Sequence, residues 1–336
     1  LSTIIGAKLA YAVGVYTYHG FANQLYLSQR EIFGDRQITD LESHALAEKI
    51  FAHLPRQSYL NNGAPKRAKE VLGLVHDLKR NNVLPEDLYK IVDENADFAK
   101  VINEKFTKFD FDSLSSGNEN DKLAHWNGFA KLFDGAPNEK RKIPRLAKTI
   151  SNKMEELLNH AQEQVSRNRD ARDKDKHGKT VSPFKGLGAY RDTITEKDAK
   201  GNTILNKQFS NAQLKEIAQF YENYDDEKSA KGVYDYDDMI LNAKKILEEI
   251  GEIRETLSAK YQYILLDEFQ DTNKAQLAIV ELLTMGKKRP NIMAVGDDDQ
   301  GIMSFQGAEF GNMKSFVDHF HVQQIISLSD NYRSAA

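Results

Sequence analysis

The chain has 336 residues, 40% of them hydrophobic, which is enough for two domains with separate cores. It contains no cysteine, so disulfides, cysteine-type zinc sites and thiol nucleophiles are excluded, and the composition fits a reducing cytoplasm. The net charge of −4 means that any surface for nucleic acid must be a local patch. No apolar stretch approaches the roughly 18 residues of a membrane span, and the first residues do not resemble a signal peptide. We therefore expect a cytoplasmic protein without a membrane anchor.

The first element predicted along the chain is a strand over residues 13–18, which are rich in β-branched and aromatic side chains. It runs into His19-Gly20 and then into an amphipathic helix. A turn at such a junction could present Thr17, Tyr18 and His19 to a ligand. His19 could equally cap the helix, and the segment alone does not separate the two possibilities.

From about Thr39 to Lys231 the pattern is helical, because apolar residues recur at spacings of three and four. Such stripes are typical of core packing. We predict a domain of several helices with Trp126 in its core. The longest stripe consists of Ile143, Leu146, Ile150, Met154, Leu157, Leu158, Ala161 and Val165.

Residues 166–179 are nearly all charged, with six Arg or Lys against three Asp. This composition predicts an exposed, mobile loop whose charges are solvated rather than bound to a phosphate backbone. The run ends in His177-Gly178-Lys179-Thr180, which matches the second half of a phosphate-binding loop. The first glycine of that motif would fall at position 173, which is Asp173, and no buried strand precedes it. We reject the match, and no other stretch of this chain supplies the motif.

A short apolar run, Tyr263 to Leu266, ends in Asp267 and Glu268. We predict a strand buried on both faces, with the carboxylates at its carboxyl end, where open α/β sheets bind ligands. Adjacent carboxylates suit a division of labour in which one holds Mg²⁺ through water and the other orients or deprotonates an attacking water. For a lone Asp-Glu pair, a solvated acidic turn explains the sequence at least as well.

The pattern then repeats. Asn273 is predicted to cap a helix that ends at Gly286, and a second buried strand over residues 291–295 ends in another acidic loop, Gly296 to Ile302. A helix over residues 310–320 and a third strand over 322–328 follow. This alternation predicts a parallel sheet with crossover helices. Two neighbouring acidic strand ends indicate a composite phosphate and metal site, within reach of an arginine after the third strand.

Five ordered motifs together resemble the UvrD/Rep family of superfamily 1 DNA helicases. Residues 264–273 resemble its Walker B motif, 296–308 its third motif and 331–334 its Asn-Tyr-Arg-Ser motif. Thr17 to Gly20 resembles a weaker Thr-Phe-His-Gly motif. Residues 235–238 resemble an Asp-Phe-Asp-Asp motif, although Asp235, Asp237 and Asp238 are also explained by capping of a helix N-terminus.

The resemblance implies roles for residues at an ATP site. Asp267 would hold Mg²⁺, with Glu268 beside it, and Glu268 would activate the water that attacks the γ-phosphate. Gln300 would sense that phosphate, Arg333 would contact it, and Tyr332 would stack on the adenine. The implied cofactors are ATP and Mg²⁺.

The resemblance also implies partners. Thr17, Tyr18 and His19 would lie along single-stranded DNA, with Phe305 stacking on a base, and partly duplex DNA would be the substrate. Stacking is a sequence-tolerant contact, which suits a motor that moves along any sequence. Translocation in this family runs in the 3′-to-5′ direction.

Two residues depart from the third motif of the family. Met303 replaces a tyrosine and Gln306 replaces an arginine, which puts DNA contact and coupling in question but leaves the carboxylate roles unchanged. The phosphate-binding loop is missing before Thr17, and so is a second motor domain after Ser334. We therefore expect an internal fragment of a helicase.

The resemblance implies an α/β fold, a partial RecA-like parallel-sheet domain of the P-loop NTPase type with a large all-helical insertion. The motor domain would comprise residues 1–38 and 232–336, and the insertion residues 39–231. The long insertion would either contact a protein partner or duplex DNA, or be decoration, and the fragment is expected to be a monomer.

Three functions compete at this point. The first is a portion of an ATP-dependent 3′-to-5′ DNA helicase that by itself lacks efficient ATPase activity. The second is a truncated DNA-binding or regulatory module with a vestigial motor. The third, an Mg²⁺-dependent nuclease using Asp267, Glu268 and residues 297–299, is less favoured because those loops carry no Lys or His.

Overall fold

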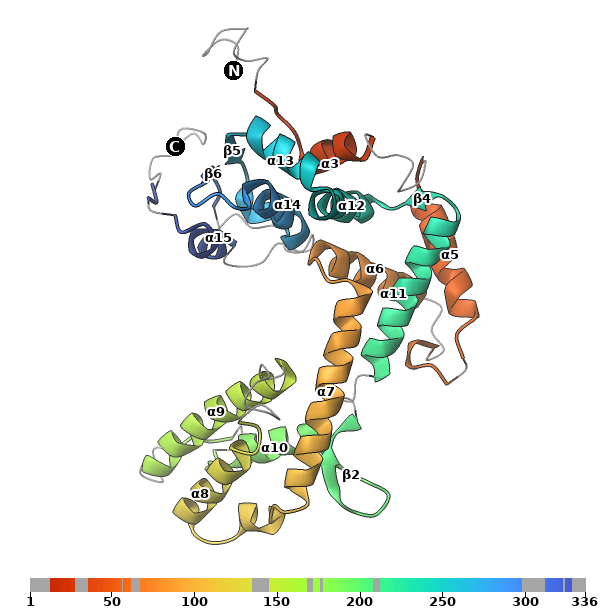
Figure 1. Cartoon of the computed structure of the whole chain (residues 1–336). Coiled ribbons are helices and arrows are strands. Elements are labelled where there is room, and N and C mark those ends of the chain that lie inside the picture. Colours follow the sequence, from red (N-terminus) through yellow and green to blue (C-terminus); the bar gives the residue numbers. More distant parts are fainter. Residues whose placement is uncertain are drawn as a thin grey trace. The chain divides into compact units, whose positions relative to one another are not determined.

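The computed structural model describes residues 13–27, 36–55, 57–61, 67–134, 145–167, 172–175, 178–207, 212–297, 312–322 and 324–327. The chain divides into two compact units, and each has its own hydrophobic core (Figure 1). The first unit comprises residues 1–84 and 219–336, and the second comprises residues 85–218. Within the described part of the chain, no helix is both long enough and apolar enough to cross a membrane.

Three helices form the centre of the first unit: α3 (Tyr18–Leu27), α12 (Tyr236–Glu249) and α14 (Lys274–Thr284). Helix α12 packs against both α3 and α14 (Figure 1). Their shared core removes apolar side chains from water, which is the main favourable contribution to folding. Its buried members are Ala22, Leu25, Met239, Ile240, Ala243, Ile246, Leu247, Ala275, Ile279 and Leu283.

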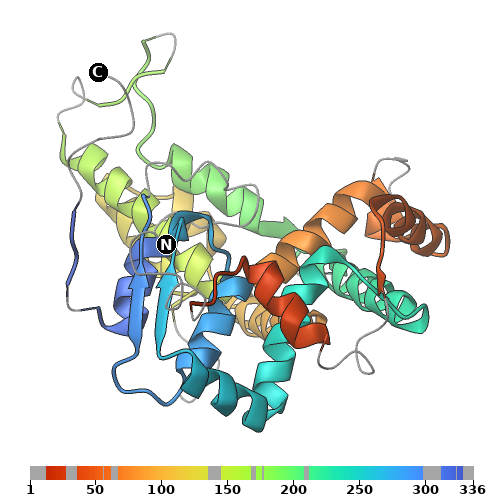
Figure 2. The same ribbon diagram turned by 90° about the horizontal axis from the view of Figure 1, so that it is seen from above.

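Strands β5 (Tyr263–Leu266) and β6 (Asn291–Ala294) run parallel, as predicted, and α14 connects them (Figure 2). The pairing continues past the strands: the Val295 amide donates to the Leu266 carbonyl (2.8 Å), and the Phe269 amide donates to the Val295 carbonyl (2.9 Å). The carboxyl ends of the two strands are therefore held side by side.

The prediction that the first of these strands is buried on both faces is wrong. Tyr263 is 71% exposed and Leu265 is 70% exposed, whereas the intervening Ile264 packs against the core. Among the described residues β5 pairs only with β6. One face of the pair is covered by the core, and the alternate side chains point to the other face.

Two further predicted strands do not form. Residues 14–17 are irregular and Tyr18 already begins α3, while the described residues of 322–328 have no strand conformation. Val15 is 80% exposed, Ile325 73% and Ile326 69%. Strand propensity reflects a fit to a pleated, half-buried surface, and within the described part of the chain no strand pairs with either segment.

Shorter elements complete the first unit. A second parallel pair joins β1 (Arg36–Gln37) to β4 (Val233–Tyr234). The helices are α5 (Asp40–Ala52), α6 (Arg67–Arg80), α11 (Ala212–Ala230, which crosses the unit boundary), α13 (Gly251–Lys260) and α15 (Asn312–Phe320), with 3-10 turns η1 (Tyr59–Asn61) and η5 (Phe269–Asp271).

The second unit is mainly helical. Helices α8 (Glu119–Ala130) and α9 (Arg145–Ser166) run alongside each other (Figure 1), and Trp126 is 2% exposed in the core, as predicted. Phe129 lies at the centre, with five aromatic rings within about 6 Å of its own. The elements are α7 (Pro85–Phe106), η2 (Phe111–Ser115), α8 (Glu119–Ala130), α9 (Arg145–Ser166), α10 (Lys185–Ile194) and the hairpin β2 (Thr195–Lys197) with β3 (Thr203–Leu205).

Part of the charged run is ordered by pairing, which corrects the prediction that its charges are solvated. The Arg172 guanidinium donates two hydrogen bonds to the Glu119 carboxylate, at 2.6 and 2.8 Å. The Asp173 backbone amide donates to the side chain of Gln164 (3.0 Å), and the backbones of Lys174 and Thr180 form an isolated antiparallel β-bridge. A planar guanidinium matches a carboxylate in this two-pronged geometry, so it orders chain that composition alone marks as loop.

The limits of the helical unit, 85 and 218, differ from the predicted insertion limits of 39 and 231. Helices α5 and α6 cluster with the first unit. The first unit combines helices with short parallel strand pairs, as in an α/β arrangement. Its assignment as a RecA-like domain interrupted by an insertion remains a prediction.

Candidate functional site

Asp267 and Glu268 follow β5 directly, and both side chains are exposed. Glu268 has a left-handed backbone (φ 47°, ψ 46°), and its amide donates to Oδ1 of Asp267 (3.1 Å). A non-glycine residue in this region is strained, and such strain persists mainly where the surrounding structure enforces it, often at functional sites. The turn leaves two carboxylates in solvent while the next residue, Phe269, is 1% exposed.

The neighbouring strand end delivers Gly296 and Asp297 to the same edge. Between the two ends lies the Gln270 side chain, which donates to Oε2 of Glu268 (2.6 Å) and accepts from the Asp297 amide (3.0 Å). Residues of the two predicted acidic loops are therefore brought together. Sequence reasoning missed Gln270, although an amide inside an acidic strand-end loop was a signal that could have found it.

The residues at this edge fit Mg²⁺. Hard cations of this kind take oxygen ligands and keep several waters, so exposed carboxylates suit them better than buried ones. Asp267, Glu268 and Asp297 are exposed carboxylates at two adjacent strand ends. The other residues predicted for the ATP site, Gln300, Tyr332 and Arg333, lie outside the described residues. So do Phe305, which is predicted to stack on a DNA base, and the departures Met303 and Gln306.

The predicted DNA-contact segment begins α3. Thr17 caps the helix, because its hydroxyl accepts from the Gly20 amide (3.0 Å). Tyr18 is half-buried and packs against the core of the first unit. Burial raises the pKa of the Tyr18 hydroxyl, and the adjacent Thr272 side chain lowers it in part. Thr17 is thus exposed, whereas most of Tyr18 faces inward.

His19 does not cap the helix; instead its ring stacks on Tyr236, with centroids 3.7 Å apart and planes 15° apart. Tyr236 is 52% exposed at the start of α12. Burial lowers the pKa of His19, although the Asp237 carboxylate opposes this effect. His19 is therefore neutral near pH 7, and the two rings form a stacked, uncharged pair that joins two of the predicted motifs.

The second of those motifs surrounds the N-terminus of α12. Asp235 caps the helix in a reciprocal arrangement with Asp238, as predicted from the sequence. Two buried ammonium groups contact it as well: Nζ of Lys79 and Nζ of Lys228 each lie 2.7 Å from Oδ2 of Asp235. Both lysines also pair with Asp238 and Asp225. We call these five residues the α12 ion cluster.

The electrostatics of the α12 ion cluster are those of a closed network. Burial opposes the charge of Lys79, yet Asp235, Asp238 and Asp225 raise its pKa well above the ordinary value. Burial likewise opposes ionisation of Asp235, but Lys79 and Lys228 together hold its pKa well below the ordinary value. The charges of Lys79 and Asp235 are thus compensated by groups of opposite sign, whereas burial, together with the Asp235 and Asp225 carboxylates, raises the pKa of Asp238.

Asp237, the remaining acidic residue, is not a cap. Its carboxylate contacts Nδ1 of His76 (2.8 Å) and Nε of Arg80 (3.1 Å). His76, Asp235 and Asp237 offer ligand atoms within 4.8 Å of one another, a spacing that could suit a metal ion. The carboxylate oxygens are already neutralised by Lys79, Lys228 and Arg80, so this grouping is an ion-pair network rather than a metal centre.

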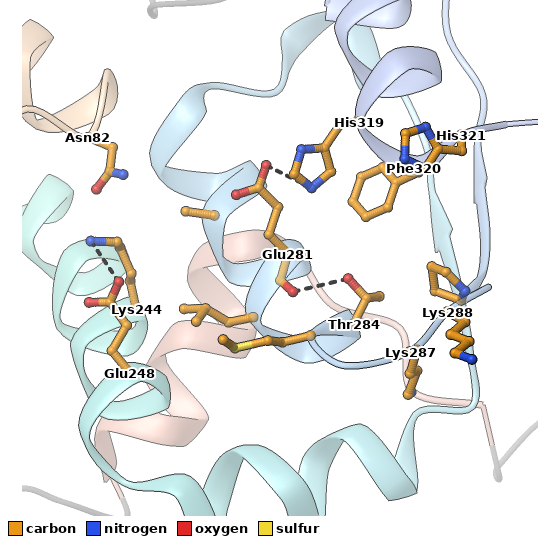
Figure 3. A pocket seen from close by; sticks show the side chains of 14 residues that line it. Asn82, Lys244, Glu248, Glu281, Thr284, Lys287, Lys288, His319, Phe320 and His321 are labelled. Atoms are coloured by element: carbon orange, nitrogen blue, oxygen red, sulfur yellow. Dashed lines mark hydrogen bonds and ion pairs between the residues drawn. The ribbon is translucent and has the colours of Figure 1, made fainter. Parts of the chain in front are cut away.

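A cavity of about 500 Å³ lies elsewhere in the first unit, beside the ends of α14 and α15 and the residues before β6 (Figure 3). Two pairs of its lining residues contact each other: Lys244 with Glu248 (3.2 Å) and Glu281 with His319 (3.5 Å). None of its lining residues was predicted as a site residue. It is separate from the carboxyl ends of the strands.

Comparison with known proteins identifies the family to which this chain belongs. The model of the UvrD/REP helicase N-terminal domain family matches residues 130–321, which is more than half of the chain. The chain therefore belongs to this family, and the resemblance inferred from its motifs is confirmed.

Individual relatives match over a shorter stretch. The ATP-dependent DNA helicase PcrA of Staphylococcus epidermidis is 39% identical over 118 residues, and PcrA of Staphylococcus aureus is equally similar over the same length. The matched stretch covers 35% of this chain but only 16% of each relative. The chain thus aligns with a small part of these helicases.

Proposed function

We propose that this chain is a portion of an ATP-dependent DNA helicase that moves 3′-to-5′ along single-stranded DNA and separates duplexes. The observation that carries the proposal is the paired strand edge. In a chain of the UvrD/REP family, β5 and β6 end side by side with Asp267 and Glu268 on one strand and Asp297 on the other. A parallel-sheet edge of this kind is where α/β proteins hold nucleotides.

The proposed chemistry is hydrolysis of the γ-phosphate of ATP. Asp267 and Glu268 would hold Mg²⁺, which supplies positive charge next to the phosphate oxygens. Glu268 would accept the proton of the attacking water, and its exposed carboxylate is available for that role. Gln300 and Arg333 would contact the γ-phosphate and Tyr332 the adenine, as the family resemblance implies.

For DNA, the proposed contacts are Thr17, Tyr18, His19 and Phe305. The geometry refines this assignment. Because Tyr18 packs against the core, we assign the DNA contacts of the first motif to Thr17 and His19 rather than to Tyr18. His19 is neutral and stacked, so it would contact a base or sugar by packing rather than by charge.

Replacing His19 by Ala is expected to lower affinity for single-stranded DNA by roughly 5- to 100-fold, the range for loss of one stacking contact. His19→Phe, which keeps a ring against Tyr236, should retain most of the affinity. Fluorescence anisotropy with a labelled oligothymidine at fixed salt measures the effect. His44→Ala on α5 is the control. Unchanged affinity in a His19→Ala protein that melts normally would remove His19 from the DNA surface.

The helicase proposal itself is tested with the longer protein that contains this sequence. Strand separation should require ATP and should start from a 3′ single-stranded tail but not from a 5′ tail. The 336-residue chain alone should show no multiple-turnover ATPase activity, because its sequence supplies no phosphate-binding loop. DNA binding without ATP-dependent strand separation would favour the regulatory module. Mg²⁺-dependent plasmid cleavage that Asp267→Ala abolishes would favour the nuclease.

A further inference from the structure

Gln270 is a buried polar side chain with both ends of its amide in use. It is 6% exposed and follows Glu268 by two residues. Its nitrogen lies 2.6 Å from a Glu268 carboxylate oxygen, and its oxygen lies 3.0 Å from the Asp297 backbone nitrogen. This side chain thus connects the loop after β5 to the loop after β6.

The partners fix which way the amide points. A carboxylate only accepts hydrogen bonds and a backbone N–H only donates them, so Gln270 must present its NH₂ group to Glu268 and its oxygen to Asp297. A carboxylate at position 270 would have no proton to donate to Glu268, and an apolar side chain would make neither bond. The position therefore requires both a donor and an acceptor.

The backbone around Gln270 is shaped to admit this contact. Glu268 occupies the left-handed region, which sends its own side chain outward while Phe269 and Gln270 turn inward. On the opposite loop, a Cβ added to Gly296 would lie 2.5 Å from Oε1 of Gln270 and 3.2 Å from the backbone nitrogen of Gln270. A side chain at position 296 would displace the Gln270 side-chain amide, so a glycine at this position leaves room for that amide.

We infer that Gln270 is a positioning residue for ATP hydrolysis: it holds the Glu268 carboxylate in place and ties it to the loop that follows β6. The inference rests on the proposed role of Glu268 and extends it to a residue that does not touch the substrate. A change in the loop after β6 is transmitted to Glu268 through one side chain.

The test compares three variants in the longer protein that contains this sequence. Gln270→Met keeps the length of the side chain and removes both hydrogen bonds, and Gly296→Ala displaces the amide without removing it. Gln276→Met is the matched control, because Gln276 also bonds a backbone amide, that of Asn273 (3.1 Å), but within the cap of α14. The readouts are kcat and KM for ATP, affinity for a fluorescent ATP analogue, and melting temperature.

Gln270→Met and Gly296→Ala are expected to lower kcat by roughly 10- to 100-fold, the effect of losing one hydrogen bond to a charged group, with KM and nucleotide affinity changed less than about threefold. Gln276→Met should leave kcat unchanged. In a Glu268→Gln background, Gln270→Met should add little, because both changes remove the same function.

Three results would overturn the inference. Normal kcat in both Gln270→Met and Gly296→Ala would do so, as would an effect of Gln270→Met that adds fully to that of Glu268→Gln. If Gln276→Met lowers kcat and the melting temperature as much as Gln270→Met does, the role of Gln270 is structural. If the unmutated protein hydrolyses no ATP, the proposed function fails and the inference falls with it, which is distinguishable from an active protein in which Gln270 is dispensable.

Discussion

Replacing Glu268 by Gln in the longer protein is expected to leave ATP binding intact and to lower turnover by roughly 100- to 10,000-fold. The substitution preserves the shape of the side chain and its place on the exposed turn after β5, but it removes the oxygen that would accept a proton from water. It also removes the charged acceptor of the Gln270 hydrogen bond. Binding should be retained because the proposed contacts to the γ-phosphate and the adenine come from Gln300, Arg333 and Tyr332.

The measurement pairs steady-state ATP hydrolysis on single-stranded DNA with the dissociation constant of a fluorescent ATP analogue. Glu252→Gln, an exposed glutamate on α13, serves as the control and should behave like the unmutated protein. Turnover that survives Glu268→Gln would refute the general-base role. Loss of both binding and turnover would instead assign Glu268 to holding the nucleotide and its metal.

Replacing Lys79 by Ala is expected to destabilise the chain by about 3–5 kcal/mol, the cost of removing one partner from a buried ion pair. Lys79 has no exposed side-chain surface and lies 2.7 Å from Asp235, a residue that is itself buried. Without Lys79, the Asp235 and Asp238 carboxylates keep only Lys228 of their two lysine partners. The melting temperature should fall by on the order of 10 °C.

Thermal unfolding followed by circular dichroism at pH 7 checks this expectation. Lys49→Ala is the matched control, because Lys49 on α5 pairs with Glu227 on α11 (2.9 Å) in solvent, where screening weakens the pair. Its melting temperature should change far less. Equal effects of the two substitutions would show that the α12 ion cluster contributes no more than a surface pair.

The same cluster predicts a pH dependence. The pKa of Asp235 is lower in the folded chain than its ordinary value of 3.8. Its contribution to stability is therefore complete above about pH 4 and is lost as the pH falls further, when the unfolded chain binds a proton before the folded one does. The pKa of Lys79 is raised, so its contribution is lost only in strong alkali. Lys79→Ala should reduce the loss of stability between pH 4 and pH 3.

Local features of the fold were predictable from the sequence. Asn273 caps α14 and Asp235 caps α12 because a side-chain oxygen before an apolar helical pattern satisfies amides a few residues away. The parallel strands β5 and β6 were predictable as well, since a short apolar run on each side of an amphipathic helix leaves few other arrangements. These signals act over short distances along the chain.

Contacts between distant residues were not predictable in this way. Lys79 meets Asp235 across 156 residues, and nothing in the surroundings of Lys79 in sequence distinguishes it from a solvated helix lysine. Stacking of His19 on Tyr236 and the reach of Gln270 to Asp297 depend equally on the assembled fold. The motif pattern identified the carboxylates of the candidate site, whereas the groups that orient them became visible only in three dimensions.

The α12 ion cluster affects how the first unit responds to changes in the length of the second unit. Lys79 lies just before the chain enters that unit at Pro85, and Lys228 lies shortly after it returns at Gln219. Both lysines contact Asp235, so the two chain segments that flank residues 85–218 are held together inside the first unit. Closure entropy grows only slowly with loop length, by about 0.6 kcal/mol per doubling. A change in the length of residues 85–218 is therefore expected to alter the closure entropy of the first unit only slightly.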